Sequence, residues 1–125
     1  MTEGRLEIKI KSRFSALHQL RLHGKPEKPH GHNWHVEAFF SAPIPCDPSI
    51  HIALASLVKQ LVSGLEGKNL MHLKALQDRP PSAENLAAHL YNRMKQEIGS
   101  LPVTITQVTV EETPRCRASY ISPKQ

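Results

Sequence analysis

The chain of 125 residues has the length of one domain, so a single domain over residues 1–125 is expected. A hydrophobic fraction of 39% with charges of both signs excludes a disordered chain. No apolar run approaches the ~18 residues that span a bilayer, and the N-terminus lacks the basic and apolar regions of a signal peptide. A cytoplasmic protein with no membrane partner is therefore expected.

The formal net charge of +5 favours an anionic partner. The basic residues are scattered and aromatic residues make up only 5% of the chain, whereas nucleic-acid-binding domains typically have one dense basic stripe with interleaved aromatics. We therefore expect no nucleic-acid partner, since a small phosphorylated substrate explains the charge equally well. Cys46 and Cys116 form no C-x-x-C motif and are expected to be free thiols.

Two strands are predicted in the first third of the chain. Residues 5–11 alternate strictly, with the apolar side chains at even positions, and residues 33–42 alternate in the same way from Trp34 to Phe40. Between them, Pro26 and Pro29 argue against a regular ladder, which predicts a loop over residues 22–29. The two strands are expected to pair antiparallel across this loop.

Two amphipathic helices are predicted next. Asp47-Pro48 is a helix-start signal, and apolar residues then follow at spacings of three and four until Gly64 and Gly67 end the helix. After a loop over residues 68–81, Ser82 is the expected cap of the second helix. The apolar positions expected on its buried stripe are Leu86, Leu90, Met94 and Ile98.

Residues 103–112 are rich in Val, Ile and Thr and predict a third strand, and residues 116–122 can return as a short fourth. The order ββααββ predicts an α+β fold, a four-stranded antiparallel sheet with two helices on one face. Such a sheet leaves its edges unpaired in a monomer, which favours a ring-shaped oligomer.

Histidines gather around the loop between the first two strands. Because side chains alternate faces in a strand, His30 and His32 would project to the same side, about 6 to 7 Å apart along the chain. His18, at the end of the neighbouring strand, would add a third imidazole and leave one tetrahedral position of a zinc ion open, as in catalytic zinc sites. From the spacing alone, an ordinary turn entering a strand is an equally good interpretation, because H-x-H is a short motif.

Four motifs occur in order along the chain: Phe14-Ser15-Ala16-Leu17-His18, His30-Gly31-His32-Asn33-Trp34, Pro81-Ser82-Ala83-Glu84-Asn85-Leu86-Ala87 and Val110-Glu111-Glu112-Thr113. Their order and spacing resemble the family of 6-pyruvoyltetrahydropterin and 6-carboxytetrahydropterin synthases. The resemblance runs from the first strand to Tyr120.

This resemblance implies a tunnelling fold (T-fold), in which subunits join their sheets into a barrel. It implies a homo-oligomer, a trimer or a hexamer of two stacked trimers, with active sites at subunit interfaces. It also implies that His18, His30 and His32 hold Zn²⁺ and that Glu112, next to Thr113, binds the pterin. One carboxylate can accept hydrogen bonds from the adjacent N–H and amino groups of a pterin. Glu111, on the opposite strand face, is the alternative anchor.

The chain departs from the family pattern at two positions. Common members carry a catalytic Cys four residues before the first His of H-G-H, where this chain has Pro26, and Leu-Asp-His in the central loop, where it has Leu70-Met71-His72. Glu27 instead gives E-x-x-H-G-H, similar to a variant subgroup in which Glu replaces the Cys as the catalytic base. The alternatives are that Glu27 is a solvated loop charge and that His72, the second candidate catalytic residue, only packs in its loop.

Three functions follow from the resemblance. The first is a zinc-dependent lyase that converts 7,8-dihydroneopterin triphosphate to 6-hydroxymethyl-7,8-dihydropterin on the folate route. The second is 6-carboxytetrahydropterin synthase on the queuosine route, against which the missing Cys counts. The third is a pterin-binding homologue with little or no turnover. Basic residues such as Lys9, Lys11 or Arg13 are candidates for holding the triphosphate.

Overall fold

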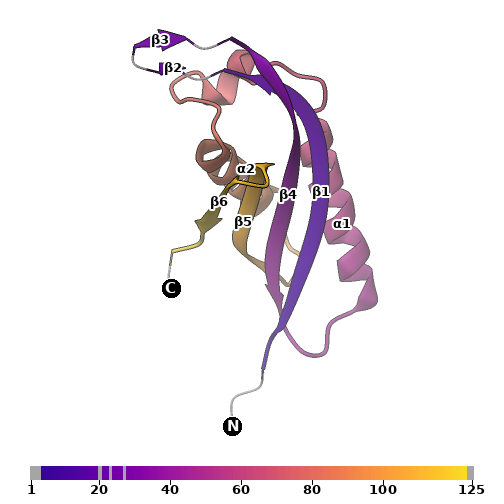
Figure 1. Ribbon diagram of the computed structural model, residues 1–125. Coiled ribbons are helices and arrows are strands. Elements are labelled where there is room, and N and C mark those ends of the chain that lie inside the picture. Colours follow the sequence, from indigo (N-terminus) through magenta and orange to yellow (C-terminus); the bar gives the residue numbers. More distant parts are fainter. Residues whose placement is uncertain (1–3, 20, 23, 27, 124–125) are drawn as a thin grey trace.

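The computed structural model describes residues 4–19, 21–22, 24–26 and 28–123. Its main sheet has the strand order β1-β4-β5-β6 and is antiparallel throughout. The strands are β1 (Leu6–His18), β4 (His30–Ala42), β5 (Thr104–Thr113) and β6 (Cys116–Ile121). The helices α1 (Pro48–Ser63) and α2 (Ala83–Glu97) cover one face of this sheet (Figure 1). The predicted α+β fold is confirmed.

The long antiparallel pair β1·β4 carries much of the core. Side chains at even positions of both strands turn toward the helices, and Phe14, Trp34 and Phe40 are at most 2% exposed. The first strand is longer than the predicted span of residues 5–11. The alternation of buried and exposed residues continues through Phe14 and Ala16 to His18, so the predicted end of the strand at residue 11 was too early.

The segment between the long strands differs from the predicted loop over residues 22–29. β2 (Arg21–Leu22) and β3 (Lys25–Pro26) form a two-residue antiparallel ladder, which the prediction had argued against. A proline is tolerated at such a position because each strand of a two-stranded ribbon has one unpaired edge, where no N–H is required.

Both predicted helices are present, but only one is capped as expected. The Asp47 carboxylate accepts a hydrogen bond from the Ser49 N–H at 2.8 Å, immediately before α1. Ser82 occupies the cap position of α2, yet its hydroxyl makes no capping bond and is buried without a hydrogen-bond partner. The predicted cap is therefore right in position and wrong in its interaction.

The connection between the helices runs beside the His18 end of β1 and contains two short 3₁₀ turns, η1 (Leu70–His72) and η2 (Lys74–Leu76). The Gly67 N–H donates to the Ser15 carbonyl at 2.7 Å, and the Leu17 N–H donates to the Lys68 carbonyl at 2.9 Å. Gly67 has a φ of +72°, which favours glycine at this turn. These bonds cover the outer edge of β1 near His18.

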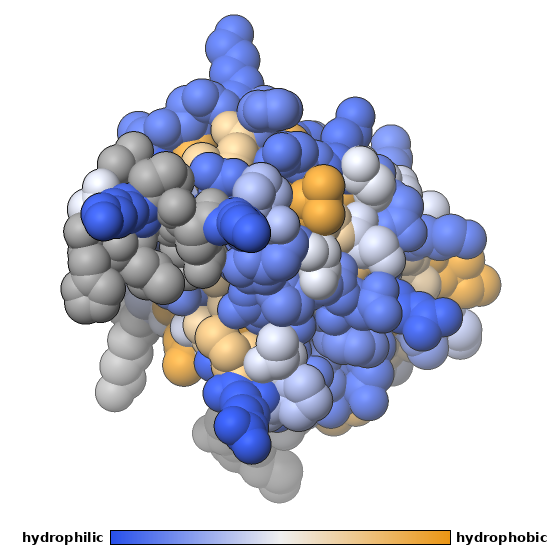
Figure 2. Space-filling model, turned by 45° about the horizontal axis from the view of Figure 1, so that its top comes forward, coloured by the Kyte–Doolittle hydropathy of each residue, from blue (hydrophilic) through white to orange (hydrophobic). Residues whose placement is uncertain are grey.

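The two outer edges of the sheet are otherwise open in the described part of the chain, where residues 6–13 of β1 pair with β4 alone and β6 pairs with β5 alone. Exposed apolar side chains lie on both edge strands, Leu6 on β1 (41% exposed) and Ile121 on β6 (66%). The visible surface is otherwise mostly hydrophilic, with apolar residues in small separate groups (Figure 2). No helix among the described residues is long and apolar enough to cross a membrane.

Candidate metal centre

Strand pairing brings the three predicted histidines together. His18, the last residue of β1, is directly opposite His30, the first residue of β4, and His32 is opposite Ala16. All three occupy even positions, so they project to the same face of the sheet as Trp34. Their ring centroids lie 4.5 Å (His18–His30), 5.2 Å (His18–His32) and 4.7 Å (His30–His32) apart.

Backbone carbonyls orient two of the imidazoles. His18 Nδ1 lies 3.0 Å from the Pro81 carbonyl oxygen, just before α2, and His30 Nδ1 lies 3.2 Å from the Lys28 carbonyl oxygen. A carbonyl only accepts, so each Nδ1 must carry the proton, and in the neutral ring Nε2 presents a lone pair. Histidines that bind metals are typically held by such a second hydrogen bond.

Glu112, near the end of β5, completes the group. Its Oε1 lies 2.5 Å from His18 Nε2, 3.2 Å from His32 Nε2 and 4.0 Å from His30 Nε2. One candidate ligand atom from each of these four residues lies within 4.8 Å of the others. The sequence predicts three nitrogen ligands and an open position, whereas the structure adds a carboxylate oxygen to the three nitrogens.

The arrangement fits a divalent metal ion such as zinc. His18 is fully buried, and despite the short contact to Glu112 its Nε2 makes no hydrogen bond of acceptable geometry. A lone pair facing a carboxylate oxygen is repulsive, and a cation between the two atoms would remove the repulsion. Imidazole nitrogen and carboxylate oxygen are both ordinary zinc ligands.

The remaining predicted site residues lie elsewhere. Thr113 ends β5, where its hydroxyl accepts a hydrogen bond from the Arg115 N–H at 3.3 Å. His72 is exposed at the end of η1 and is not part of the histidine–glutamate group. Glu111, the alternative anchor, lines a pocket on the opposite sheet face together with Lys11 and Arg117. Glu27 lies outside the described residues.

The structure also places Cys116 beside the group, which the sequence analysis missed. Cys116 is paired with Thr113 across the tight turn between β5 and β6. Cys116 is exposed, but slight desolvation raises the pKa of its thiol, and its hydrogen bond and charge interaction with Glu112 raise it further. Glu112 and Cys116 are four residues apart and flank Thr113-Pro114, which is a turn signal. This spacing could have suggested that the two side chains lie close together.

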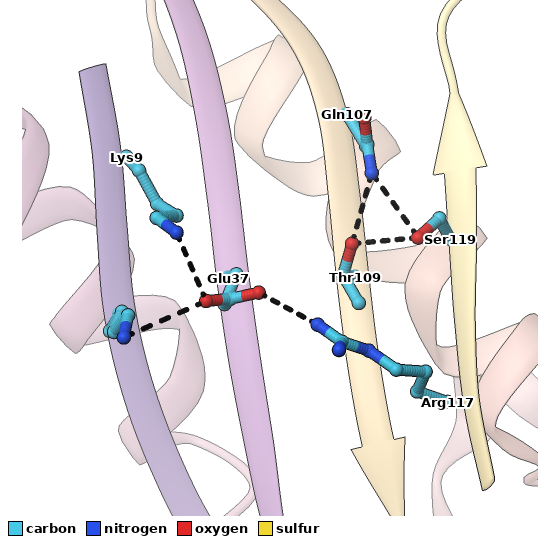
Figure 3. A network of polar contacts seen from close by, with 7 residues as sticks. Lys9, Glu37, Gln107, Thr109, Arg117 and Ser119 are labelled. Carbon is cyan, nitrogen blue, oxygen red and sulfur yellow. Dashed lines mark hydrogen bonds and ion pairs between the residues drawn. The ribbon is translucent and has the colours of Figure 1, made fainter.

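A second polar cluster lies on the sheet face that the helices leave open (Figure 3). The Glu37 carboxylate accepts a hydrogen bond from Arg117 at 3.0 Å, and its other oxygen lies 3.5 Å from Lys9 Nζ and 3.9 Å from Lys11 Nζ. Lys9 and Lys11, two of the candidates for binding the triphosphate, therefore project from the face opposite the imidazoles within one chain.

Taken together, the fold and the histidine–glutamate group define a small α+β domain with a residue group that could bind a metal at one end of its sheet. A sequence model described as 6-pyruvoyl tetrahydropterin synthase matches residues 7–123. The chain therefore belongs to the 6-pyruvoyl tetrahydropterin synthase family, whose members are lyases.

Solved structures agree with this assignment at the level of the fold. The 6-pyruvoyl tetrahydropterin synthase of Caenorhabditis elegans superposes with a TM-score of 0.79 at 18% identity, covering 96% of this chain and 97% of that one. A Plasmodium vivax 6-pyruvoyltetrahydropterin synthase, in which a glutamate described as catalytic is replaced by alanine, gives 0.70 at 19% identity, covering 94% and 98%. An uncharacterized Wolinella succinogenes protein gives 0.71 at 13% identity, covering 97% and 100%. No curated protein matched the chain.

Proposed function

We propose that the protein is a zinc-dependent lyase that cleaves 7,8-dihydroneopterin triphosphate to 6-hydroxymethyl-7,8-dihydropterin. The observation that carries this proposal is the convergence of three imidazoles and one carboxylate, with two of the rings oriented by backbone carbonyls. His18, His30 and His32 would hold Zn²⁺. When bound, zinc supplies a Lewis acid that lowers the pKa of a hydroxyl near it.

The substrate would be positioned by the carboxylate of Glu112. In this role the carboxylate accepts hydrogen bonds from the N–H and amino groups on the edge of the pterin ring, which directs the side chain of the pterin toward the imidazoles.

Glu27 is the proposed base. It would take the proton from the hydroxyl on the second side-chain carbon, and the bond between the first and second carbons would break. The electron pair would pass to the first carbon, which then takes up a proton, and a two-carbon aldehyde carrying the triphosphate would leave. The E-x-x-H-G-H motif supports this role, as does the catalytic glutamate named for the Plasmodium vivax enzyme.

His72 is proposed as a second proton-transfer residue in an interfacial site. Within one chain it is exposed on η1, so it would have to act at a site shared with a second copy in a trimer or hexamer. The open edges of β1 and β6 support such an assembly.

Incubation of the zinc-loaded protein with 7,8-dihydroneopterin triphosphate, followed by product identification, tests the proposal. We expect 6-hydroxymethyl-7,8-dihydropterin, with a rate that falls by about 10²–10⁴-fold in Glu27→Ala, the usual contribution of a general base. Glu97→Ala is the matched control, because Glu97 is exposed on α2 and pairs with Arg93. Undiminished turnover in Glu27→Ala would contradict the assignment of the base.

The same assay separates the two alternatives. Formation of 6-carboxytetrahydropterin would identify the second reaction of the family. Tight pterin binding without product would identify a pterin-binding homologue. The last outcome is favoured by one observation, that Pro26 and Met71 replace the Cys and Asp of common members.

A further inference from the structure

Glu112 has a geometric conflict between two roles. As a pterin anchor its carboxylate must point its oxygens at the heterocycle. In the structure its Oε1 instead faces the imidazoles, with the closest approach to the fully buried His18. The Glu112 side chain is only 16% exposed, so little of the carboxylate is open to solvent.

The position of Oε1 matches that of a fourth metal ligand. Ligand atoms around a tetrahedral zinc, each 2.0–2.1 Å from the metal, are about 3.3 Å apart. The three distances from Oε1 to the imidazole Nε2 atoms, 2.5, 3.2 and 4.0 Å, bracket this value. A metal held by the three rings would therefore have Glu112 within reach, and the position that an open catalytic site leaves for substrate would be closed.

We infer that Glu112 is a displaceable fourth ligand. In the substrate-free protein its carboxylate closes the metal site, and an arriving pterin draws it away by offering two N–H donors. This inference rests on the proposed pterin specificity. One carboxylate then couples recognition of the heterocycle to opening of the metal site, so a ligand without the pterin edge would leave the site closed.

The competing explanation is that Glu112 only pairs with the imidazoles when no metal is present. Metal binding separates the two explanations. If Glu112 is a ligand, Glu112→Ala and Glu112→Gln should weaken zinc binding by at least about tenfold, the lower end of the loss seen for outer-shell partners. Glu111→Ala is the matched control, because this neighbour lies on the opposite sheet face. Equal affinities in all variants would overturn the inference.

Cobalt substitution tests the displacement itself. The visible absorption of bound Co²⁺ changes when a ligand is exchanged, so the wild-type protein should differ from Glu112→Ala before any pterin is added. The probe is 6-methylpterin, which has no side-chain hydroxyl to bind the metal. It should shift the wild-type and Glu111→Ala spectra and leave the Glu112→Ala spectrum unchanged at the same concentration.

Each outcome decides the inference. An unchanged wild-type spectrum overturns displacement, whether or not quenching of pterin fluorescence shows binding. Identical spectra of the wild type and Glu112→Ala without pterin overturn ligation. Circular dichroism on both Glu112 variants, one of them nearly isosteric, checks that the fold is intact. The cobalt measurement needs no turnover. If the protein shows the absorption shift but makes no product, the proposed reaction is refuted and the inference about Glu112 still stands.

Discussion

At the scale of single residues, His18 is the most constrained member of the histidine–glutamate group. Its ring is fully buried, its Nδ1 is bound to the Pro81 carbonyl, and its Nε2 faces Glu112. Zinc at 100 times its dissociation constant should raise the free energy of unfolding by about 2.7 kcal/mol, provided that only the folded state binds it. His18→Ala should lose this increase. His51→Ala should keep it, because His51 is exposed on α1. Chemical denaturation with and without zinc measures this rise in the free energy of unfolding for each variant. If His18→Ala shows the same rise as the wild type, the assignment of His18 as a ligand is refuted.

His89 on α2 gives a pH dependence of stability. Burial lowers its pKa below the ordinary value of 6.5, and the charge of Arg93 lowers it further. The unfolded chain therefore binds more protons below about pH 6.5, and stability should fall as the pH drops through 6.5 toward the lower pKa of the folded state. Urea unfolding between pH 8 and pH 5 should show a smaller decrease for His89→Gln than for the wild type. Parallel curves for the two proteins would contradict this expectation.

At the scale of elements, the start of α2 behaves differently from an ordinary capped helix. Replacing a capping Ser by Ala usually costs about 1 kcal/mol, but the Ser82 hydroxyl makes no cap bond and is buried without a partner. Removing a buried, unsatisfied hydroxyl relieves a desolvation penalty. Ser82→Ala should therefore leave the free energy of unfolding unchanged or raise it by up to about 1 kcal/mol. A loss of a full kcal/mol in urea unfolding would show that the hydroxyl does stabilise the helix.

The elements also show how much the sequence could predict. Alternation in residues 5–11 and 33–42 was enough to pair the long strands and to place His30 and His32 on one face. The approach of Glu112 to these rings was not predictable from geometry, because it depends on the register of β4 with β5, which shifts between Phe39 and Phe40. A bulge of this kind has no reliable sequence signal, since it is set by packing across the sheet.

At the scale of the whole molecule, charge is divided between the two faces of the sheet. The helix-covered face carries the core and, at one end, the histidine–glutamate group, whereas the open face carries Glu37 surrounded by Lys9, Lys11 and Arg117. Three cations around one carboxylate leave an excess of positive charge on this face. If copies join their sheets into a barrel, the open faces would line its interior, and basic residues of one copy could approach a substrate held by another.

The open sheet edges lead to a prediction about assembly. Leu6 on β1 and Ile121 on β6 are exposed apolar residues on strands that pair on one side only in the described chain. Unpaired, apolar edges favour association, and pairing of β6 of one copy with β1 of the next would cover both. Light scattering after size-exclusion chromatography should give a mass of three or six times the 14.0 kDa of the chain.

A charge at this contact should dissociate the assembly. Ile121→Lys would bury a lysine at the junction of β6 with its neighbour, and we expect a shift toward the monomer mass that grows on dilution. Ile52→Lys is the matched control, because Ile52 is 73% exposed but lies on α1, away from both edges. If Ile121→Lys keeps the wild-type mass while Ile52→Lys loses it, the copies associate through α1 rather than through the sheet edges. Because His72 is proposed to act only at an interface, the monomeric form of Ile121→Lys should also lose lyase activity while its zinc affinity remains unchanged.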